Sequence, residues 1–321
     1  MHKGKRLHDA AKYEILAAAY SSGEAREGTR INPADVGGYR TKTVRAGDFL
    51  YISCYPLIGY NANREQKKRL AEFEAERLKN AKLRLKYNRY NNSRRMIELE
   101  QLVHANMKPG DLHVTCTYEM QDFQDRKSLV FRTREEAKQE AYNYLRRVRY
   151  FLKKMGCDVS EFRWICVTVT KRRLQEAANP LPDAHHHHIL LHGVPPELRN
   201  DIENLWKLGF CNTTRIQDSE NGFAALAAYV ARQETSFNGE NAWARSYTTS
   251  RNIIRPKVTT ADSKISRRCA AKIAADVQID GKAIFETLFP GFRLVEDSPK
   301  TIVSDYVAGT YIRAKLRRMR D

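Results

Sequence analysis

Several familiar signals are missing from this sequence, and their absence narrows its class. The six cysteines are scattered and contain no C-x-x-C pair, so we expect them to be reduced and mostly buried, as in a cytoplasmic protein. The N-terminus has no apolar segment of the signal-peptide type. The longest apolar run, Phe223–Ala231, is too short to cross a bilayer, so no membrane partner is expected. The ATP-binding loop G-x-x-x-x-G-K-[ST] does not occur either.

Positive charge, in contrast, is abundant. The 321 residues carry a net charge of +18, and 42% of them are apolar, enough for one large domain or two modest ones with real cores. A surface this basic attracts polyanions, of which nucleic acid is the commonest. A solvated basic surface without a nucleic-acid partner is the alternative, and charge alone favours nucleic acid only modestly.

The first region, residues 1–110, reads as a strand pair followed by basic helices. Strand-forming residues flank a turn at Gly47-Asp48. A long, highly charged helix is expected over 63–90, either solvated or facing DNA. We expect Asn91–Asn92 to break it and Ser93 to cap a second helix that ends near Asn106.

The middle region, residues 111–258, alternates strand and helix patterns. Leu112–Glu119 alternates apolar and polar residues as a strand does, and the capping box of Thr133 and Glu136 opens a helix that stops at Gly156. The remaining order gives β-α-β-β-α-β-α, which predicts an α+β fold: a small antiparallel sheet with helices on one face. Residues 259–321 form a mixed C-terminal accessory region with a helix and further strands.

One strand of this region is rich in histidine. Five of the nine histidines lie at 185–188 and 192. On a strand, His186 and His188 share one face, about 7 Å apart at the backbone, and both can reach one divalent ion. The opposite face would carry His185 and His187. We weighed a purification tag, a buried structural pair and a zinc site, and prefer catalytic metal binding because no further zinc ligands stand at the usual spacing.

A tyrosine downstream is the candidate nucleophile. Phe223, Leu226 and Tyr229 are spaced by threes, so Tyr229 is expected on the helix face that packs against the sheet. Arg232, one turn later, would favour the phenolate form. A core aromatic is the plain alternative for Tyr229 taken alone. The order of a histidine strand and then a tyrosine helix suits metal-assisted attack by tyrosine.

This order resembles the HUH endonucleases, which nick single-stranded DNA in rolling-circle replication and plasmid transfer. Over about Val44–Pro256 the chain also resembles the rolling-circle replication-associated proteins of bacterial mobile elements. The segments that carry this resemblance are NNSRRMIELEQLVHANMKPGDLHVTCTYE (91–119), the W-x-x-G motif (206–209), LAAYVARQ (226–233) and SYTTSRNIIRP (246–256). The resemblance implies an HUH/RRM-like sheet of ferredoxin-like topology.

The resemblance also implies a metal site and a nucleophile. His186 and His188 correspond to the ligands of Mg²⁺ or Mn²⁺, although a shift to His185 and His187 is not excluded by the sequence. Tyr229 corresponds to the nucleophile, and Arg232 stands where the family often has lysine. The sequence departs from the family at Thr168 and Thr170, which stand on the strand where an acidic ligand is usual. Glu119 on another strand is the substitute we expect, and Arg251 and Asn252 are the expected DNA contacts.

The implied activity is replication initiation: nicking and rejoining of single-stranded origin DNA through a 5′-phosphotyrosine, with a host polymerase and helicase as further partners. A single tyrosine also predicts self-association on DNA. Three alternatives remain open. They are a non-catalytic nucleic-acid-binding protein, an HUH transposase or relaxase, and a zinc-stabilised interaction protein.

Overall fold

The computed structural model describes residues 36–118, 133–171, 184–234, 247–303 and 309–319. The chain divides into two compact units, one combining Met1–Ile97 with Pro256–Asp321 and the other formed by Glu98–Arg255. The sequence-based division at 110 and 258 kept the N-terminal and C-terminal regions apart, whereas in the structure strands from both regions pair in one sheet.

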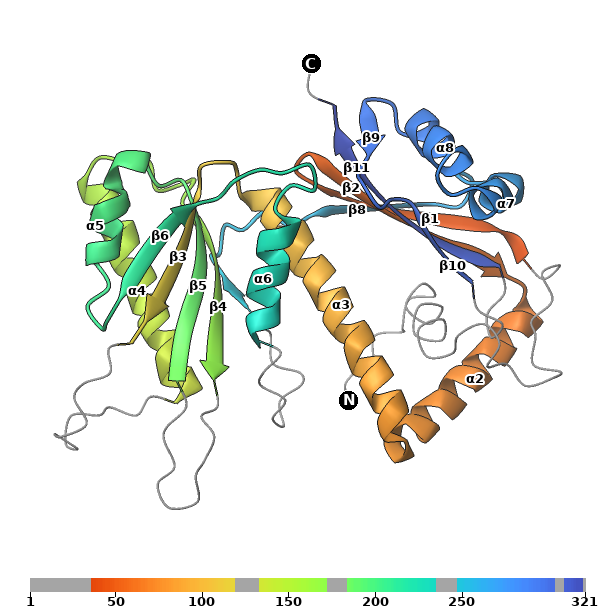
Figure 1. The fold of residues 1–321 in the computed structure, drawn as a ribbon, viewed down its shortest axis with the longest axis horizontal. Helices are drawn as coiled ribbons and strands as arrows, with labels where there is room; N and C mark the ends of the chain where they lie inside the picture. Colours follow the sequence, from red (N-terminus) through yellow and green to blue (C-terminus); the bar gives the residue numbers. More distant parts are fainter. Residues whose placement is uncertain (1–35, 119–132, 172–183, 235–246, 304–308, 320–321) are drawn as a thin grey trace. The chain divides into compact units, whose positions relative to one another are not determined.

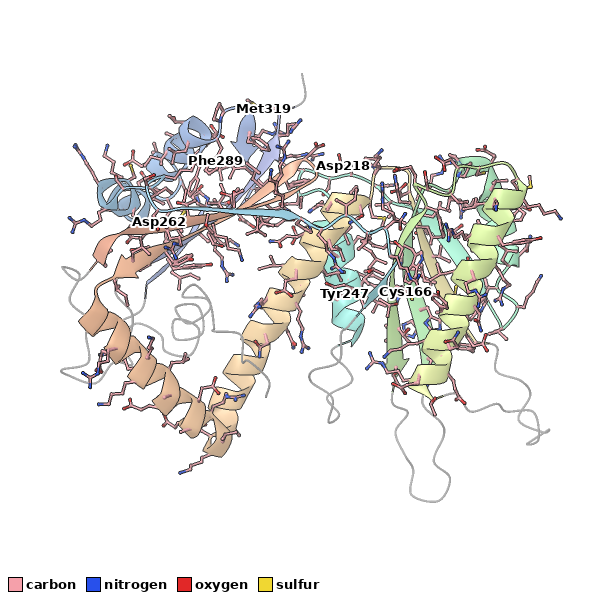
Figure 2. All side chains as sticks on the ribbon, turned by 180° about the vertical axis from the view of Figure 1, so that it is seen from behind. Cys166, Asp218, Tyr247, Asp262, Phe289 and Met319 are labelled. Atoms are coloured by element: carbon pink, nitrogen blue, oxygen red, sulfur yellow. The ribbon has the colours of Figure 1, made fainter. Side chains whose placement is uncertain are left out.

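The first unit is built on a six-stranded antiparallel sheet. The path runs β10-β11-β2-β1-β8, and β9 pairs with β11. The strands are β1 (Val36–Ala46), β2 (Phe49–Ile58), β8 (Lys257–Ala261), β9 (Phe292–Leu294), β10 (Lys300–Val303) and β11 (Thr310–Arg318). The strand pair expected around Gly47 is confirmed as β1 and β2, and Gly47 has the positive φ of 58° that its turn requires. Helices α7 (Arg267–Ala275) and α8 (Asp280–Leu288) contribute Ile273 and Phe285 to a core shared with β2 and β11, and Phe289 follows α8 (Figure 2).

The charged segment after β2 forms two long helices, α2 (Tyr60–Lys79) and α3 (Ala81–Asn106). The break between them lies at Asn80, whose backbone is extended at φ −112° and ψ 111°. The expected break at Asn91–Asn92 is wrong, and Ser93 lies inside α3 rather than at a cap. Asparagine costs a helix only about 0.7 kcal/mol relative to alanine, so two in a row do not end a helix whose last turns are anchored by buried side chains such as Leu102.

The second unit contains a five-stranded antiparallel sheet in the order β6-β3-β5-β4-β7. The strands are β3 (Leu112–Thr117), β4 (Arg163–Lys171), β5 (Ala184–His192), β6 (Cys211–Arg215) and β7 (Thr248–Thr249). Its first four strands in chain order lie as 4-1-3-2, which is the split β-α-β arrangement of ferredoxin-like folds. The predicted α+β class is therefore confirmed.

Helices cover both faces of this sheet, which differs in part from the single helical face that the sequence predicts (Figure 1). On one face lie α4 (Arg134–Lys154) and α5 (Arg199–Asn204), preceded by the short 3₁₀ helix η2 (Pro196–Leu198). On the other face lie α6 (Ala224–Glu234) and the last turns of α3, which pack on the apolar residues of β4. The second face is the one that carries His186 and His188.

Local signals explain where these elements begin and end. The predicted capping box is present: the Thr133 hydroxyl accepts from the Glu136 amide, and the Glu136 carboxylate accepts from the Thr133 amide. Gly156, just after α4, has φ +78°, as helix-stopping glycines often do. All six cysteines are free thiols. None of the helices in the described part of the chain has the length and apolar character that a membrane crossing requires.

Candidate functional site

The histidine strand β5 divides its side chains between the two faces of the sheet. His187 lies on the α4 face, where its ring contacts Trp206 at 5.7 Å between centroids. His186 and His188 lie on the α6 face, with their rings 5.1 Å apart. The structure therefore brings His186 and His188 to the same side as Tyr229, as the preferred register of the sequence predicts, and leaves His187 on the opposite side.

His187 has the environment of a structural histidine. It is fully buried, with its Nε2 atom 2.9 Å from the Tyr118 hydroxyl and its Nδ1 atom 3.0 Å from the Thr168 hydroxyl. Burial, reinforced by the neighbouring histidines, lowers the pKa of His187 to about 3, so the ring is neutral at physiological pH. Both ring nitrogens are engaged within the fold, so the alternative register through His187 would require breaking these bonds.

The two threonines on β4 have a related role. Thr168 bonds to His187, and the Thr170 hydroxyl lies 3.0 Å from Nδ1 of His185. These positions are where the family resemblance leads one to expect a carboxylate. Here they hold the histidines of the far face in place, because their side chains alternate with the apolar residues of β4 that face α6.

A third imidazole joins the Tyr229 face from the neighbouring strand β3. His113 stacks on His188 with the ring centroids 5.3 Å apart, and its Nε2 atom lies 3.2 Å from Nδ1 of His188. Burial lowers the pKa of His113, which favours its neutral form. His113 is a site residue that was not predicted from the sequence. The alternation of residues along β3 gives the sheet face of His113. Its position next to His188 depends on the register of β3 against β5, in which His113 pairs with Leu190.

Tyr229 completes the cluster from above the sheet. Its ring lies 5.2 Å from that of His188 and 6.2 Å from that of His113, both in edge-on orientation. The side chain is nevertheless 47% exposed, whereas Phe223, just before α6, is only 6% exposed. The expectation that Tyr229 lies on the sheet side of α6 is met, but it is not a core aromatic.

The start of α6 is fixed by a buried histidine of α3. The backbone amide of Phe223 donates to Nε2 of His104 over 2.8 Å, and the two rings stack with centroids 5.5 Å apart. Alanines on the inner side of α6, such as the fully buried Ala227, allow the helix to approach β4 closely. These contacts set the position of the helix that carries Tyr229.

The fit of a divalent ion to this cluster rests on the spacing of the imidazoles. Two imidazoles that bind one ion at 2.0–2.1 Å, with an angle of about 90–110° between them, have ring centroids roughly 4.5–5.3 Å apart. His186 and His188, at 5.1 Å, satisfy this condition. Within the described residues no group of three or more His, Cys, Asp or Glu side chains is already arranged as a metal site. Glu119, the expected carboxylate ligand, lies outside the described residues.

Arg232 belongs to α6, three residues after Tyr229, and its side chain lies outside the described part of the structure. Arg251 and Asn252 are less close to the cluster. Arg251 and Asn252 follow Ser250, whose amide donates to the carbonyl of Trp164 near the start of β4. His186 pairs with Val169, five residues further along β4 than Trp164, which corresponds to about 17 Å of strand.

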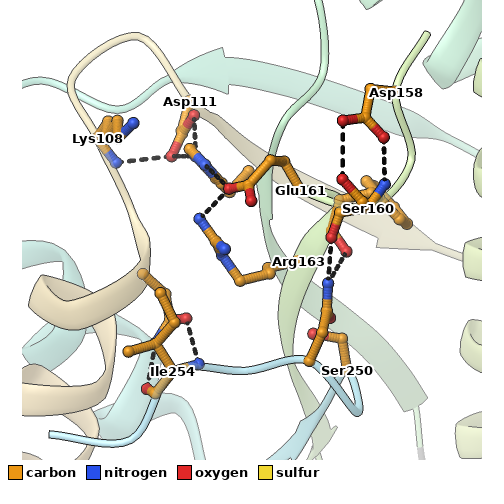
Figure 3. Close-up of polar contacts among 12 residues, drawn as sticks. Lys108, Asp111, Asp158, Ser160, Glu161, Arg163, Ser250 and Ile254 are labelled. Carbon is orange, nitrogen blue, oxygen red and sulfur yellow. Dashed lines mark hydrogen bonds and ion pairs between the residues drawn. The ribbon is translucent and has the colours of Figure 1, made fainter.

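The segment around Asn252 is held by a network of polar contacts (Figure 3). The Asn252 side-chain amide donates to the carbonyls of Ser160 at 2.8 Å and Phe162 at 3.2 Å. Two residues later, the amide of Ile254 donates to Asn106 in the last turn of α3. Asn252 therefore has a structural task, and Arg251 is exposed. The DNA contacts expected of both residues stay predictions.

Comparison with known proteins adds no relative: no protein-family model, curated protein or solved structure matches the chain. The function must therefore be argued from the site itself.

Proposed function

We propose that the second unit nicks and rejoins single-stranded DNA with Tyr229 as the nucleophile, as a rolling-circle replication initiator does. The observation that carries the proposal is the position of Tyr229. Its half-exposed ring lies 5.2 Å from that of His188, on the sheet face that also holds His186 and His113. Its half-exposed ring is open to a substrate, and the histidines on the same sheet face supply ligands for an ion next to it.

In this mechanism the Tyr229 oxygen attacks a DNA phosphorus, and the bond from phosphorus to the 3′ oxygen breaks. The 5′ phosphate stays on Tyr229, whose phenol gives up its proton, and the departing 3′ oxygen takes one up, so the released strand ends in a 3′-hydroxyl that a polymerase can extend. Because the phosphodiester is exchanged rather than hydrolysed, the reverse attack rejoins the strand without ATP.

The surrounding histidines have two tasks in this proposal. Nε2 of the neutral His113 lies 3.2 Å from Nδ1 of His188 and would accept its N–H, which leaves Nε2 of His188 for an ion. His186 and His188 would hold Mg²⁺ or Mn²⁺, and such an ion would polarise the phosphate and offset its developing negative charge. Arg251 follows Ser250, which lies beside Trp164, about 17 Å along β4 from the position of His186. We therefore assign Arg251 to DNA several nucleotides from the cut.

A second candidate function is non-catalytic binding of single-stranded DNA. The exposure of Tyr229 favours it, because an exposed aromatic ring can stack on a base. The two functions differ in what the phenol oxygen does. A binder tolerates phenylalanine at this position, whereas a nicking enzyme does not.

The test uses single-stranded oligonucleotides from the protein's own replicon, with Mn²⁺ or EDTA, on a denaturing gel. With the label at the 3′ end, the wild type should give a band shifted by the mass of the protein. With the label at the 5′ end, it should give a shorter free strand that a polymerase extends. Both products should disappear in EDTA and in Tyr229→Phe.

A matched control is Tyr142→Phe, which alters another partly exposed tyrosine, on α4. This variant should form the adduct at the wild-type rate. An adduct that survives Tyr229→Phe refutes the assignment of the nucleophile. Tight binding without any adduct, for every strand of the replicon, would leave the binding function in its place.

A further inference from the structure

The charges of α4 are separated along its length. The glutamates are confined to its first two turns, and residues 141–157 contain no carboxylate. The same stretch contains five basic residues, Arg146, Arg147, Arg149, Lys153 and Lys154. None of the five forms an ion pair with the described residues, in contrast to Lys138, which lies 4.0 Å from Glu135. A positive potential that no acidic neighbour compensates therefore marks this end of the helix.

Part of this basic surface borders a cavity. The cavity has a volume of about 630 Å³ and lies between α4 and the end of α5 at Leu205. Arg146, Arg147 and Lys154 line it, and no acidic residue does. Tyr150, also in the lining, is 73% exposed, which is unusual for a tyrosine that has a packing role only. The spacing of these residues by three and four places them on one side of the helix.

Arg147, one of the lining residues, is held in place by a hydrogen bond within the fold. Its Nε atom donates to the carbonyl of Leu205 over 3.1 Å, which fixes the guanidinium against the C-terminal end of α5. Its Nη2 atom is buried and has no hydrogen-bond partner among the described residues. A buried guanidinium nitrogen without a partner is unfavourable, and a nearby anion lowers that cost.

We propose that this cavity, which we call the α4 cavity, binds the backbone of single-stranded nucleic acid, with Tyr150 stacking on a base. Phosphate is the anion that arginine and lysine recognise together, and an exposed aromatic ring among cations is the combination that binds unpaired bases. The α4 cavity lies on the sheet face opposite to Tyr229, so this site is separate from the proposed nicking site and does not depend on it.

The test measures binding of a fluorescein-labelled 20-nucleotide oligo-dT to the full chain by anisotropy, at several salt concentrations. The variant is Arg146→Gln/Lys154→Gln. If both cations contact phosphate, the slope of log affinity against log salt should fall by about 1.4, and the affinity at 0.1 M salt by about 25-fold. Tyr150→Ala should weaken binding by about tenfold with the salt slope unchanged, because stacking releases no ions.

The matched control is Arg149→Gln/Lys153→Gln, which removes the same charge from exposed positions of the same helix outside the cavity lining. Glutamine favours helices, so both double variants should keep the wild-type circular dichroism. The control should lower affinity by less than threefold. Equal losses in the two double variants, or no loss in the cavity variant, would overturn the proposal. A preference for duplex over oligo-dT at the same length would overturn the stacking role of Tyr150.

These measurements are independent of nicking. Tyr229→Phe should bind oligo-dT as the wild type does, and the cavity variant should still form a covalent adduct when the oligonucleotide is saturating. If the adduct is never observed but the cavity variant still binds weakly, only the proposed nicking function fails.

Discussion

The anchor between His104 and Phe223 allows one prediction to be developed quantitatively. Nε2 of His104 accepts the Phe223 amide, so its proton lies on Nδ1, which faces a Glu100 carboxylate oxygen 3.9 Å away. His104 and Phe223 are 5% and 6% exposed, so neither group can turn to water instead. His104→Phe keeps a ring for stacking but leaves the amide without its acceptor, which should cost about 1–3 kcal/mol.

His104→Gln has the opposite effect. A glutamine side-chain oxygen can reach the position of Nε2 and accept the amide, but the stacked ring is lost, at a cost of about 0.5–1.5 kcal/mol. His104→Phe should therefore unfold at a lower urea concentration than His104→Gln. The readout is tryptophan fluorescence, because all three tryptophans of the chain lie within Glu98–Arg255 and report on the second unit.

The same pair of variants tests whether this anchor positions Tyr229. A displacement of about 1 Å can lower the rate of a positioned reaction by 100-fold. Under conditions where both variants are folded, adduct formation should fall further in His104→Phe than in His104→Gln. The reasoning would be refuted if the glutamine variant were as unstable as the phenylalanine variant, or if both matched the wild type in stability.

Two further predictions concern backbone strain and thiol reactivity. Gly193→Ala and Gly156→Ala both place alanine at a positive φ, but only Gly193→Ala brings a Cβ atom within 3.1 Å of the Glu161 carbonyl oxygen. Gly193→Ala should therefore lower the urea midpoint of unfolding more than Gly156→Ala. Equal midpoints would contradict this. Burial raises the pKa of Cys54 to about 12, so in the folded protein at pH 9 iodoacetamide should alkylate the partly exposed Cys269 well before Cys54, as followed by peptide mass spectrometry. Equal labelling rates of Cys54 and Cys269 would be inconsistent with the buried position of Cys54. Because the thiol ionises near pH 9 in the unfolded chain, its contribution to folding stability is fully present below pH 9 and is lost as the pH rises from 9 towards 12.

Much of the second unit follows from local sequence signals. The capping box at Thr133, the stop at Gly156 and the alternation of Leu112–Thr117 are interactions between near neighbours, so they can be identified without knowing the fold. The order β-α-β-β-α-β restricts the sheet to few arrangements, and the ferredoxin-like one is among them. The expected break at Asn91–Asn92 failed because buried residues further along α3 outweigh the weak preference of asparagine.

The site could be predicted only in part, for a related reason. Alternation along β5 gives the face that His186 and His188 share. It does not give the register between strands, so the contribution of His113 was not foreseen. Similarly, spacing by threes suggests one helix side for Phe223 and Tyr229, but six residues turn a helix by about 600°, so the two positions lie about 120° apart. One of them is 6% exposed and the other 47%.

The pairing of β2 with β11 has a consequence for the order in which the chain can fold. It joins Cys54 to Ile312, a separation of about 260 positions, with the whole second unit encoded between them. A ribosome therefore completes the second unit before it synthesises β8 and β11, the described strands that flank the β1–β2 hairpin. The second unit is in this sense an inserted domain that matures first. Once β8 has paired with β1, the edge of β2 still lacks β11, and an unpaired strand edge carries an aggregation risk.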